Sequence, residues 1–173
     1  MSDTKATIQQ LTNNLPQHGK VEWIGLRPHK RVDMVIVDKA LAIEGKGLEG
    51  DHYAGRSGNR SVTLVQAEHL GVIASVLNKH AVMPHELRRN IMVSGINLLA
   101  LKGKRFCIGE ALFEMTGVCH PCSRMEEILG QGGYNAMRGH GGITARIIQG
   151  GWIALGDSVG NCAGDRVVML NDL

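Results

Sequence analysis

Two cysteines three positions apart, Cys119 and Cys122, stand beside His120 and Arg124 in the chain. The packing of a hydrophobic core does not require two thiols next to an imidazole and a guanidinium. An apolar, β-type run precedes the pair, and the run 125–129 after it favours the start of a short helix. A thiol at a strand-to-helix junction meets free backbone N–H groups and the positive end of a helix, and both stabilise a thiolate. The segment therefore predicts either a nucleophile or a ligand for a soft metal.

A Cys-x-x-Cys pair also has three more ordinary interpretations: a thioredoxin-like redox motif, half of a zinc site, or incidental thiols. A zinc site would need two further ligands, and a thioredoxin-like pair would lie early in a strand–helix unit, whereas this pair follows several expected strands. Cys107 and Cys162 are instead expected to be small packing residues, because free cysteine is commonly buried. The distant residues from which zinc ligands would have to come are Cys107, His120, His140 and Cys162.

Length and composition restrict the class of protein. A chain of 173 residues is large enough for one domain with a proper core. Lys and Arg number 19 against 16 for Asp and Glu, a net charge of 19 − 16 = +3, and aromatic residues make up only 3%, so nucleic-acid binding is not indicated. The polar N-terminal segment lacks the apolar stretch of a signal peptide, and no stretch approaches the roughly 20 apolar residues of a membrane span. We expect a cytoplasmic protein without a membrane partner, whose four cysteines are reduced and form no disulfide framework.

The elements around the cysteine pair are short. Residues 2–20 predict a short helix or a loose arm, and residues 21–173 are expected to form one domain. Strands are predicted at 21–26, 34–37, 61–65 and 90–95, a helix at 66–78, and one helical turn at 84–89 that begins at Pro84. The glycine-rich segment 44–60 is predicted to be a long functional loop, although such a loop can also be a simple connection. Beyond residue 98 the apolar runs are brief and divided by glycine: 98–101, 105–108, 111–115, 144–148, 152–155 and 167–170. This pattern favours a strongly curved sheet or barrel, mainly β with a few helices (α+β).

Four stretches together resemble a known family. They are the run 47–52 (GLEGDH), the run 88–91 (RRNI), the run 119–122 (CHPC), and the closing pattern 141–146 (GGITAR) followed by 150–159 (GGWIALGDSV). In this order they are similar to the MOSC domain, the C-terminal domain of molybdenum cofactor sulfurase, in its small stand-alone bacterial type. The resemblance implies a MOSC-like β-barrel that binds the molybdenum cofactor and uses one cysteine to coordinate molybdenum or to carry sulfur. It also brings the family-level term pyridoxal phosphate binding.

The resemblance implies a set of site residues. Cys122 is the best match to the family cysteine and is the expected metal ligand, with Cys119 as the other candidate catalytic thiol. Glycines let backbone N–H groups approach an oxyanion, arginines make bidentate contacts to a phosphate, and Asn90 offers donor and acceptor contacts to a pterin edge. Asp51 and His52 can position a proton or simply cap a turn, and the loop at His140 can close over the cofactor or merely join two strands. The expected cofactor-binding residues are Gly50, Asp51, His52, Arg56, Arg60, Arg89, Asn90 and Arg124.

Three functions remain open at the level of sequence. The first is a molybdenum-dependent oxidoreductase that reduces an N–O bond in an N-hydroxylated substrate with an external electron-donor protein. The second is a sulfur carrier that receives a persulfide from a partner cysteine desulfurase, since the chain is too short to include the pyridoxal-phosphate domain that would generate one. The third is a cofactor-free binding domain on the same scaffold.

Overall fold

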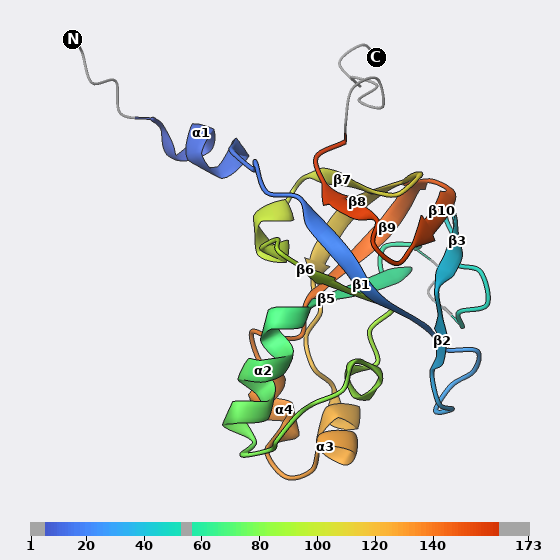
Figure 1. Ribbon diagram of the computed structural model, residues 1–173, viewed down its shortest axis with the longest axis vertical. Helices are drawn as coiled ribbons and strands as arrows, with labels where there is room; N and C mark the ends of the chain where they lie inside the picture. Colours follow the sequence, from blue (N-terminus) through green and yellow to red (C-terminus); the bar gives the residue numbers. More distant parts are fainter. Residues whose placement is uncertain (1–5, 53–56, 163–173) are drawn as a thin grey trace.

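A closed barrel of seven strands forms the body of the protein (Figure 1). The computed structural model describes residues 6–52 and 57–162, to which all structural statements refer. Around the barrel the strand order is β1-β11-β7-β8-β9-β5-β6, and β6 returns to β1; only β5 and β6 are parallel neighbours. The barrel strands are β1 (Gly19–Leu26), β5 (Val62–Gln66), β6 (Ile91–Ser94), β7 (Arg105–Ile108), β8 (Ala111–Val118), β9 (Ile143–Gln149) and β11 (Ser158–Gly160). The expectation of a mainly β, barrel-like fold with a few helices is confirmed.

A smaller sheet lies beside the barrel. It has three strands in the order β10-β3-β4, and all its pairings are antiparallel. One further short strand, β2 (Val35–Val37), pairs with the end of β1 outside the closed ring. The bounds of the small sheet are β3 (Lys39–Ile43), β4 (Gly47–Leu48) and β10 (Gly151–Ala154). β2 and the connection between β1 and β2 therefore lie outside the closed ring, next to the end of β1.

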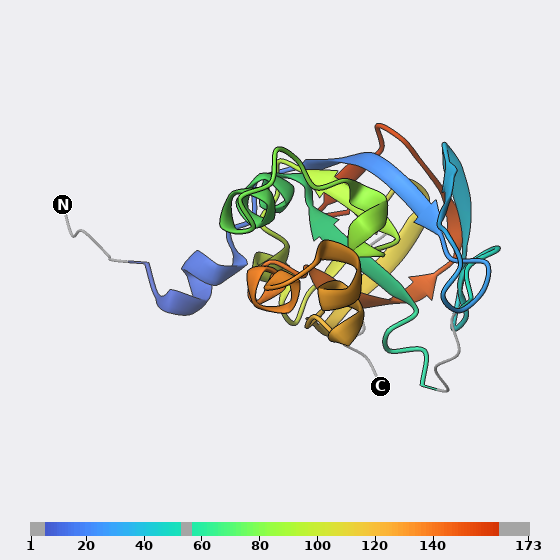
Figure 2. The same ribbon diagram turned by 90° about the horizontal axis from the view of Figure 1, so that it is seen from below.

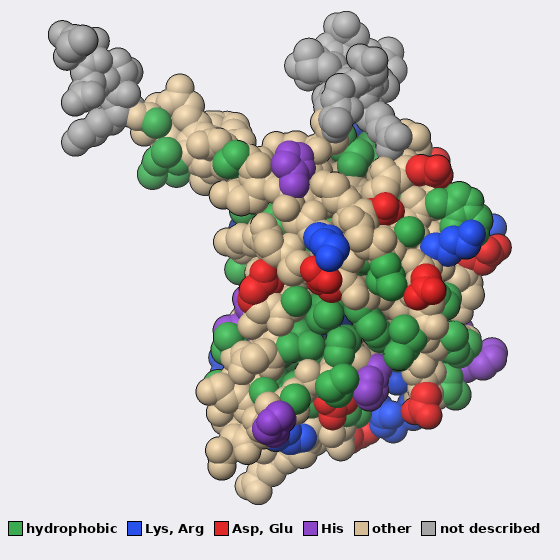
Figure 3. All heavy atoms as spheres, viewed as in Figure 1, with side chains coloured by type: hydrophobic (Ala, Val, Ile, Leu, Met, Phe, Trp, Pro, Cys, Tyr) green, Lys and Arg blue, Asp and Glu red, His purple; other side chains and the backbone are tan. Residues whose placement is uncertain are grey.

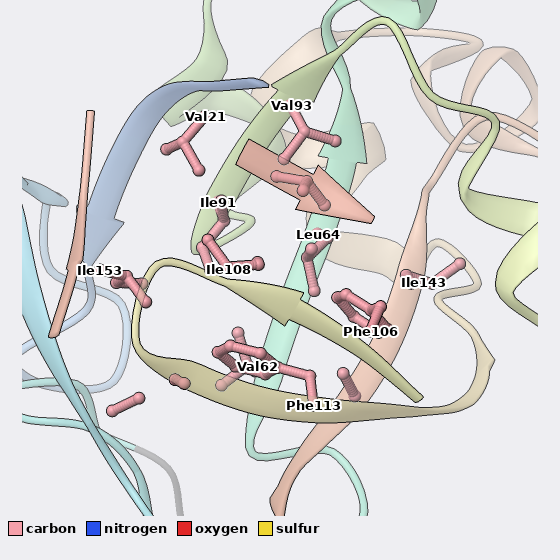
Figure 4. Close-up of a cluster of buried hydrophobic side chains, with 14 of the residues drawn as sticks. Val21, Val62, Leu64, Ile91, Val93, Phe106, Ile108, Phe113, Ile143 and Ile153 are labelled. Atoms are coloured by element: carbon pink, nitrogen blue, oxygen red, sulfur yellow. The ribbon is translucent and has the colours of Figure 1, made fainter. Parts of the chain in front are cut away.

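The barrel interior is filled by aliphatic side chains and two phenylalanines (Figure 4). β8 alternates buried and partly exposed residues along much of its length, as a strand with one face on the core must. Phe106 and Phe113 are directly opposed on β7 and β8, with ring centroids 5.6 Å apart, and both are fully buried. The packed interior makes the barrel a rigid support for the loops at its ends.

Short helices cover one end of the barrel, and Figure 2 shows them gathered there. A second apolar cluster, which includes Ile73 and Met125, lies beneath them and is separate from the barrel interior. The elements are α2 (Ala67–Val76), the 3₁₀ turn η1 (Pro84–Leu87), α3 (Ser123–Leu129) and α4 (Gly133–Met137). The N-terminal helix α1 (Ile8–Asn13) projects away from the barrel in both views. No helix in the described part of the chain is both long and apolar enough to cross a membrane.

Several local predictions are wrong. The run Leu98–Leu101 is a 3₁₀ helix, η2, because Asn97 caps it through the Leu99 N–H. The segment 44–60 contains the two-residue strand β4, and α4 was not expected at all because its glycine and asparagine are weak helix formers. The strand expected at 167–170 lies outside the described residues.

The expectation of four reduced cysteines is also wrong. Cys107 on β7 forms a disulfide with Cys162, just after β11. The register of the barrel explains the pairing, because Cys107 lies opposite Gly160 and the chain then needs only two more residues to bring Cys162 alongside. The packing role predicted for these two cysteines is replaced by a covalent link between β7 and the end of β11.

Candidate functional site

Cys122 lies at the junction that the sequence predicts. β8 ends at Val118, and α3 begins at Ser123 with Cys122 as its N-cap residue. Cys122 is exposed, whereas Cys119 is buried with 4% of its surface accessible. The backbone N–H of Cys119 donates to the Gly142 carbonyl at 2.8 Å, which holds this segment against the start of β9. Of the two thiols, only Cys122 is open to a ligand.

The Cys122 side chain lines a cleft of about 340 Å³, which we call the basic cleft. Its other walls carry guanidinium, ammonium and imidazole groups, and among its described lining residues none has a carboxylate. The imidazole rings of His29 and His52 lie near each other, with centroids 6.5 Å apart and planes tilted by 45°. The permanently charged lining residues are Arg27, Lys30, Arg31, Arg88 and Arg124. These five cations outnumber the two carboxylates that pair with them, Asp51 and Glu127, so the surroundings of the thiol keep a net positive charge that attracts anions.

Three separate segments supply these cations. The connection between β1 and β2 provides Arg27, Lys30 and Arg31, and α3 provides Arg124. Arg88 is the C-cap of η1 and adopts a left-handed backbone with φ 54°, which turns the chain sharply into β6. Burial lowers the pKa of the Arg88 guanidinium, and the charges of Arg124 and Arg27 lower it further. The cations are therefore close enough to repel one another, and a bound anion would relieve that repulsion.

Acidic partners lie behind and beside the cleft. Glu127 on α3 accepts a hydrogen bond from Arg124 at 2.7 Å and one from Arg31 at 3.3 Å. The hydrogen bond from Arg124, followed by the positive charges nearby, lowers the pKa of Glu127. This shared carboxylate ties α3 to the β1–β2 connection across one side of the cleft.

Arg27 is fixed by a buried polar network. Its Nε and Nη2 donate to the two carboxylate oxygens of Asp51 at 3.1 and 2.8 Å, and its Nη2 also donates to Asn90 Oδ1 at 3.0 Å. The Asp51 side chain has no accessible surface, and Asn90 is fully buried. The amide of Asn90 donates to Asp51 Oδ1 at 2.9 Å and to the Gly25 carbonyl, while its Oδ1 also accepts from Thr63. Asp51 and Asn90 thus hold the guanidinium that faces the cleft.

Arg89 is a buried cation next to the two thiols. Its Nε donates to the Gly141 carbonyl at 2.7 Å and its Nη1 to the Leu87 carbonyl at 3.0 Å, but its Nη2 has no hydrogen-bond partner. Burial lowers the pKa of Arg89, and the nearby thiols of Cys119 and Cys122 act against that shift. A buried guanidinium nitrogen without a partner is costly, so this side of the site fits an anionic ligand or a thiolate.

The loop before β9 closes the far side of Arg89. Gly141 lies so close to the Cys119 carbonyl, and Gly142 to the Leu64 carbonyl, that a Cβ at either position would collide with backbone. Gly142 also has φ 82°, where side chains are strained. His140 packs edge-on against His69 of α2, with ring centroids 4.9 Å apart. His140 therefore lies at the packing contact between this loop and α2.

The predicted site residues fall into distinct places. The basic cleft brings together Cys122, His52 and Arg124. Gly50, at φ 83°, makes the turn that leads into Asp51. Arg60 is exposed, and its charge lowers the pKa of Arg89, so it lies near that side of the site. Arg56 lies outside the described residues.

Sequence reasoning missed the β1–β2 connection. The run 27–31 (RPHKR) was interpreted only as a proline-punctuated loop, yet it supplies three of the five cations of the cleft. Four basic or histidine residues within five positions are a signal that could have indicated an anion site. The zinc interpretation loses two of its candidate ligands, since Cys107 and Cys162 bond to each other. Within residues 6–52 and 57–162, no three His, Cys, Asp or Glu side chains are grouped so as to hold a metal ion.

Comparisons with known proteins concern the family and the fold. The family model described as MOSC domain matches residues 44–160, while no curated protein matches the sequence. The YUAD protein from Bacillus subtilis superposes with a TM-score of 0.71 at 23% identity, over 82% of this chain and 94% of that one. YiiM from Escherichia coli gives a TM-score of 0.66 at 18% identity, over 83% of this chain and 70% of that one. YiiM from Geobacillus stearothermophilus gives a TM-score of 0.65 at 16% identity, over 87% of this chain and 77% of that one. At these identities the solved structures show the fold alone.

Proposed function

Because the chain belongs to the MOSC domain family, which is associated with the molybdenum cofactor, we propose that it binds this cofactor in the basic cleft with Cys122 as the molybdenum ligand. One observation carries the proposal: an exposed thiol lies in a cleft lined by five cations and, among its described lining residues, by no carboxylate. The cofactor combines a phosphate with a sulfur-ligated metal, and this cleft offers partners for both.

The arginines are suited to the phosphate. A guanidinium donates well to phosphate oxygens, and Arg27 is held by Asp51 and Asn90 through its Nε and Nη2. Its Nη1 lies outside this network and can donate to a phosphate with little loss of side-chain entropy. Lys30 and Arg31 supply further charge from the same connection. In this proposal Asp51 and Asn90 act by positioning Arg27, because their own polar atoms are already engaged with the protein.

The thiol is suited to the metal. Thiolate sulfur is a soft ligand that molybdenum in a sulfur-rich environment prefers to a hard carboxylate. Arg89, whose buried Nη2 has no hydrogen-bond partner, places a cation near Cys122 on this side of the site. Cys119 is buried and does not line the cleft.

The reaction best suited to such a centre is reduction of an N–O bond. In the balanced step R–NH–OH + 2 e⁻ + 2 H⁺ → R–NH₂ + H₂O, the N–O bond breaks and the oxygen leaves as water. The bound cofactor would supply the two-electron chemistry, and a reduced haem, flavin or iron–sulfur protein would supply the electrons. Among the lining residues of the cleft, His29 and His52 carry imidazole groups, which can donate or accept a proton in this step.

Expression in a molybdenum-replete host, followed by metal and pterin analysis of the purified chain, tests the proposal. We expect molybdenum and pterin in equal amounts, at close to one per chain, and loss of both in a variant with Arg27→Ala and Arg31→Ala. A Lys20→Ala, Lys79→Ala variant removes two exposed cations elsewhere and is the matched control. A wild-type chain that contains neither component under these conditions would refute cofactor binding.

The exposure of Cys122 supports a second candidate, a sulfur carrier. A persulfide on this thiol would be open to a donor desulfurase and to an acceptor protein. Such a chain would show a mass increase of about 32 Da on Cys122, one sulfur atom in the persulfide chemistry of cysteine, and no molybdenum. The cofactor proposal predicts bound molybdenum and no added sulfur on Cys122. Metal analysis and mass spectrometry of one preparation therefore distinguish the cofactor-binding protein from the sulfur carrier.

A further inference from the structure

The edge strand β2 leaves part of its backbone without a partner in the described structure. β2 is the last strand of its sheet and pairs only with β1, where Ile36 lies opposite Gly25. The Gly25 N–H donates to the Asn90 carbonyl at 2.8 Å, and the Gly25 carbonyl accepts from the Asn90 side chain, so both groups point toward β6. Two opposed residues of an antiparallel pair either bond to each other or both point away, so the N–H and carbonyl of Ile36 point away from β1. Ile36 therefore offers one donor and one acceptor to a further strand.

The side chains of β2 are uncovered as well. Val35 and Ile36 have 49% and 60% of their surface exposed, and Figure 3 shows apolar side chains gathered beneath β1 and toward β2. An exposed apolar edge strand is a template for pairing with another chain, and proteins usually protect such edges with charged residues or proline. The three residues of β2 include neither. This edge is therefore suited to strand pairing.

Charged residues at the two ends of β2 indicate which chain pairs with it. Asp33 lies three positions before Ile36 and Lys39 three positions after it, and both are exposed. Neither makes a salt bridge to another described residue. If two identical strands pair antiparallel about Ile36, Asp33 of each copy lies opposite Lys39 of the other, and opposite charges at such positions stabilise a sheet. The chain bends at Asp38, and the flexible four-carbon stem of Lys39 lets its ammonium reach across that bend.

Other registers of the same two strands are less favourable. A register centred on Val35 would set Arg31 of each copy opposite Lys39 of the other, which places two cations together at both ends. A shift by a single position would set the outward-pointing groups of Ile36 against a residue whose own groups point toward β1. Charge and backbone direction therefore both favour the register centred on Ile36.

We propose that β2 is a self-association surface, through which two copies of this chain pair antiparallel about a two-fold axis at Ile36. The Ile36 N–H of each copy donates to the Ile36 carbonyl of the other, and two Asp33–Lys39 pairs lie at the ends of the contact. The same patch is used on both copies, so the contact closes on itself and assembly stops at the dimer. The dimer joins the sheets of two barrels edge to edge, and it does not depend on whether the basic cleft holds a cofactor.

Sedimentation velocity on the purified full chain measures the dimer. The paired strands are short, so we expect a small interface with a dissociation constant on the order of 10–100 µM. Ile36→Pro removes the N–H that joins the copies but keeps the pairing with β1, because that N–H points away from β1. Loss of the two reciprocal hydrogen bonds should weaken the dimer about tenfold or more. A wild-type chain that stays monomeric at about 1 mM would overturn the proposal and leave β2 to a different partner or to none.

A charge-reversal series tests the register. Asp33→Lys and Lys39→Asp each set like charges opposite one another at both ends, and each should weaken the dimer about tenfold. The double variant Asp33→Lys, Lys39→Asp restores opposite charges and should return the dissociation constant to within about threefold of the wild-type value. An equimolar mixture of the two single variants should form a heterodimer, because each copy then meets opposite charges at both ends.

Two matched controls make the same charge changes outside the contact. Glu44→Lys and Lys79→Asp alter exposed positions and should leave the dissociation constant unchanged. Circular dichroism shows which variants are folded, and if Ile36→Pro does not fold, the charge-reversal series decides. A wild-type dimer that is unaffected by Ile36→Pro and by both single reversals would place the contact elsewhere and overturn the proposal. A mixture of folded single variants that forms no heterodimer would overturn it as well.

Discussion

Replacing Asn90 with alanine should destabilise the protein strongly, because its side chain connects three parts of the barrel. It makes five hydrogen bonds, to Thr63 N and Oγ1, Arg27 Nη2, Gly25 O and Asp51 Oδ1. In Asn90→Ala, Arg27 and Asp51 keep each other as partners, and the Thr63 hydroxyl keeps the Asn90 backbone N–H. The Thr63 N–H and the Gly25 carbonyl lose the side-chain partner, in a fully buried site.

The magnitude follows from those two backbone groups. Each buried group left without a partner costs about 1–3 kcal/mol, so for two groups we expect the free energy of unfolding to fall by about 2–6 kcal/mol. Small domains have about 5–15 kcal/mol in total, so this is a large share. Asn97→Ala removes one exposed cap hydrogen bond, to the Leu99 N–H, and should cost only about 0.5–1 kcal/mol.

Urea unfolding, followed by circular dichroism and by tryptophan fluorescence, measures both variants. Trp23 is well placed as a reporter because its ring lies over Gly25, next to the network. A loss in Asn90→Ala no larger than that in Asn97→Ala would refute the view that this network holds β1, β5 and Arg27 together.

Two further predictions concern other parts of the fold. Burial, and then the charge of His140, lowers the pKa of His69 from its ordinary value of 6.5, so the unfolded chain binds a proton more readily than the folded one. The contribution of His69 to stability is therefore complete above pH 6.5 and is lost as the pH falls below it. Urea unfolding at pH 7.5 and pH 5.5 gives the change in the free energy of unfolding between the two pH values, and this change should be smaller in His69→Gln than in the control His80→Gln. Equal changes in the two variants would contradict this. The Cys107–Cys162 disulfide closes a loop with a sequence separation of 55, so replacing both cysteines with serine should lower the free energy of unfolding by up to about 4 kcal/mol. Dithiothreitol should lower the free energy of unfolding of the wild type by a similar amount and leave that of the double variant unchanged. If neither the double substitution nor dithiothreitol lowers the free energy of unfolding, the disulfide does not stabilise the fold.

Local sequence patterns were sufficient for part of this structure. The apolar run before Cys119 and the helix-like run after Cys122 correctly placed the thiols at a strand-to-helix junction. Short runs punctuated by glycine correctly indicated a curved sheet, because few other folds tolerate strands of this length without long crossover helices.

The parts that could not be predicted depend on contacts between distant segments. Arg27 and Cys122 are 95 positions apart, and only the closed barrel brings the β1–β2 connection to α3. The disulfide depends on the register that sets Cys107 opposite Gly160, which no local pattern records. Asp51 and Asn90 were expected to contact the cofactor themselves, and that remains a prediction; their hydrogen bonds to Arg27 are a tertiary feature that sequence spacing does not reveal.

The central claim is that the sulfur of Cys122 coordinates molybdenum. X-ray absorption at the molybdenum edge counts the sulfur neighbours of the metal in cofactor-loaded protein. We expect one fewer sulfur neighbour in Cys122→Ser than in the wild type, and no change in Cys119→Ser, because that thiol is buried away from the cleft. An unchanged sulfur count in Cys122→Ser, with the metal still bound, would contradict it.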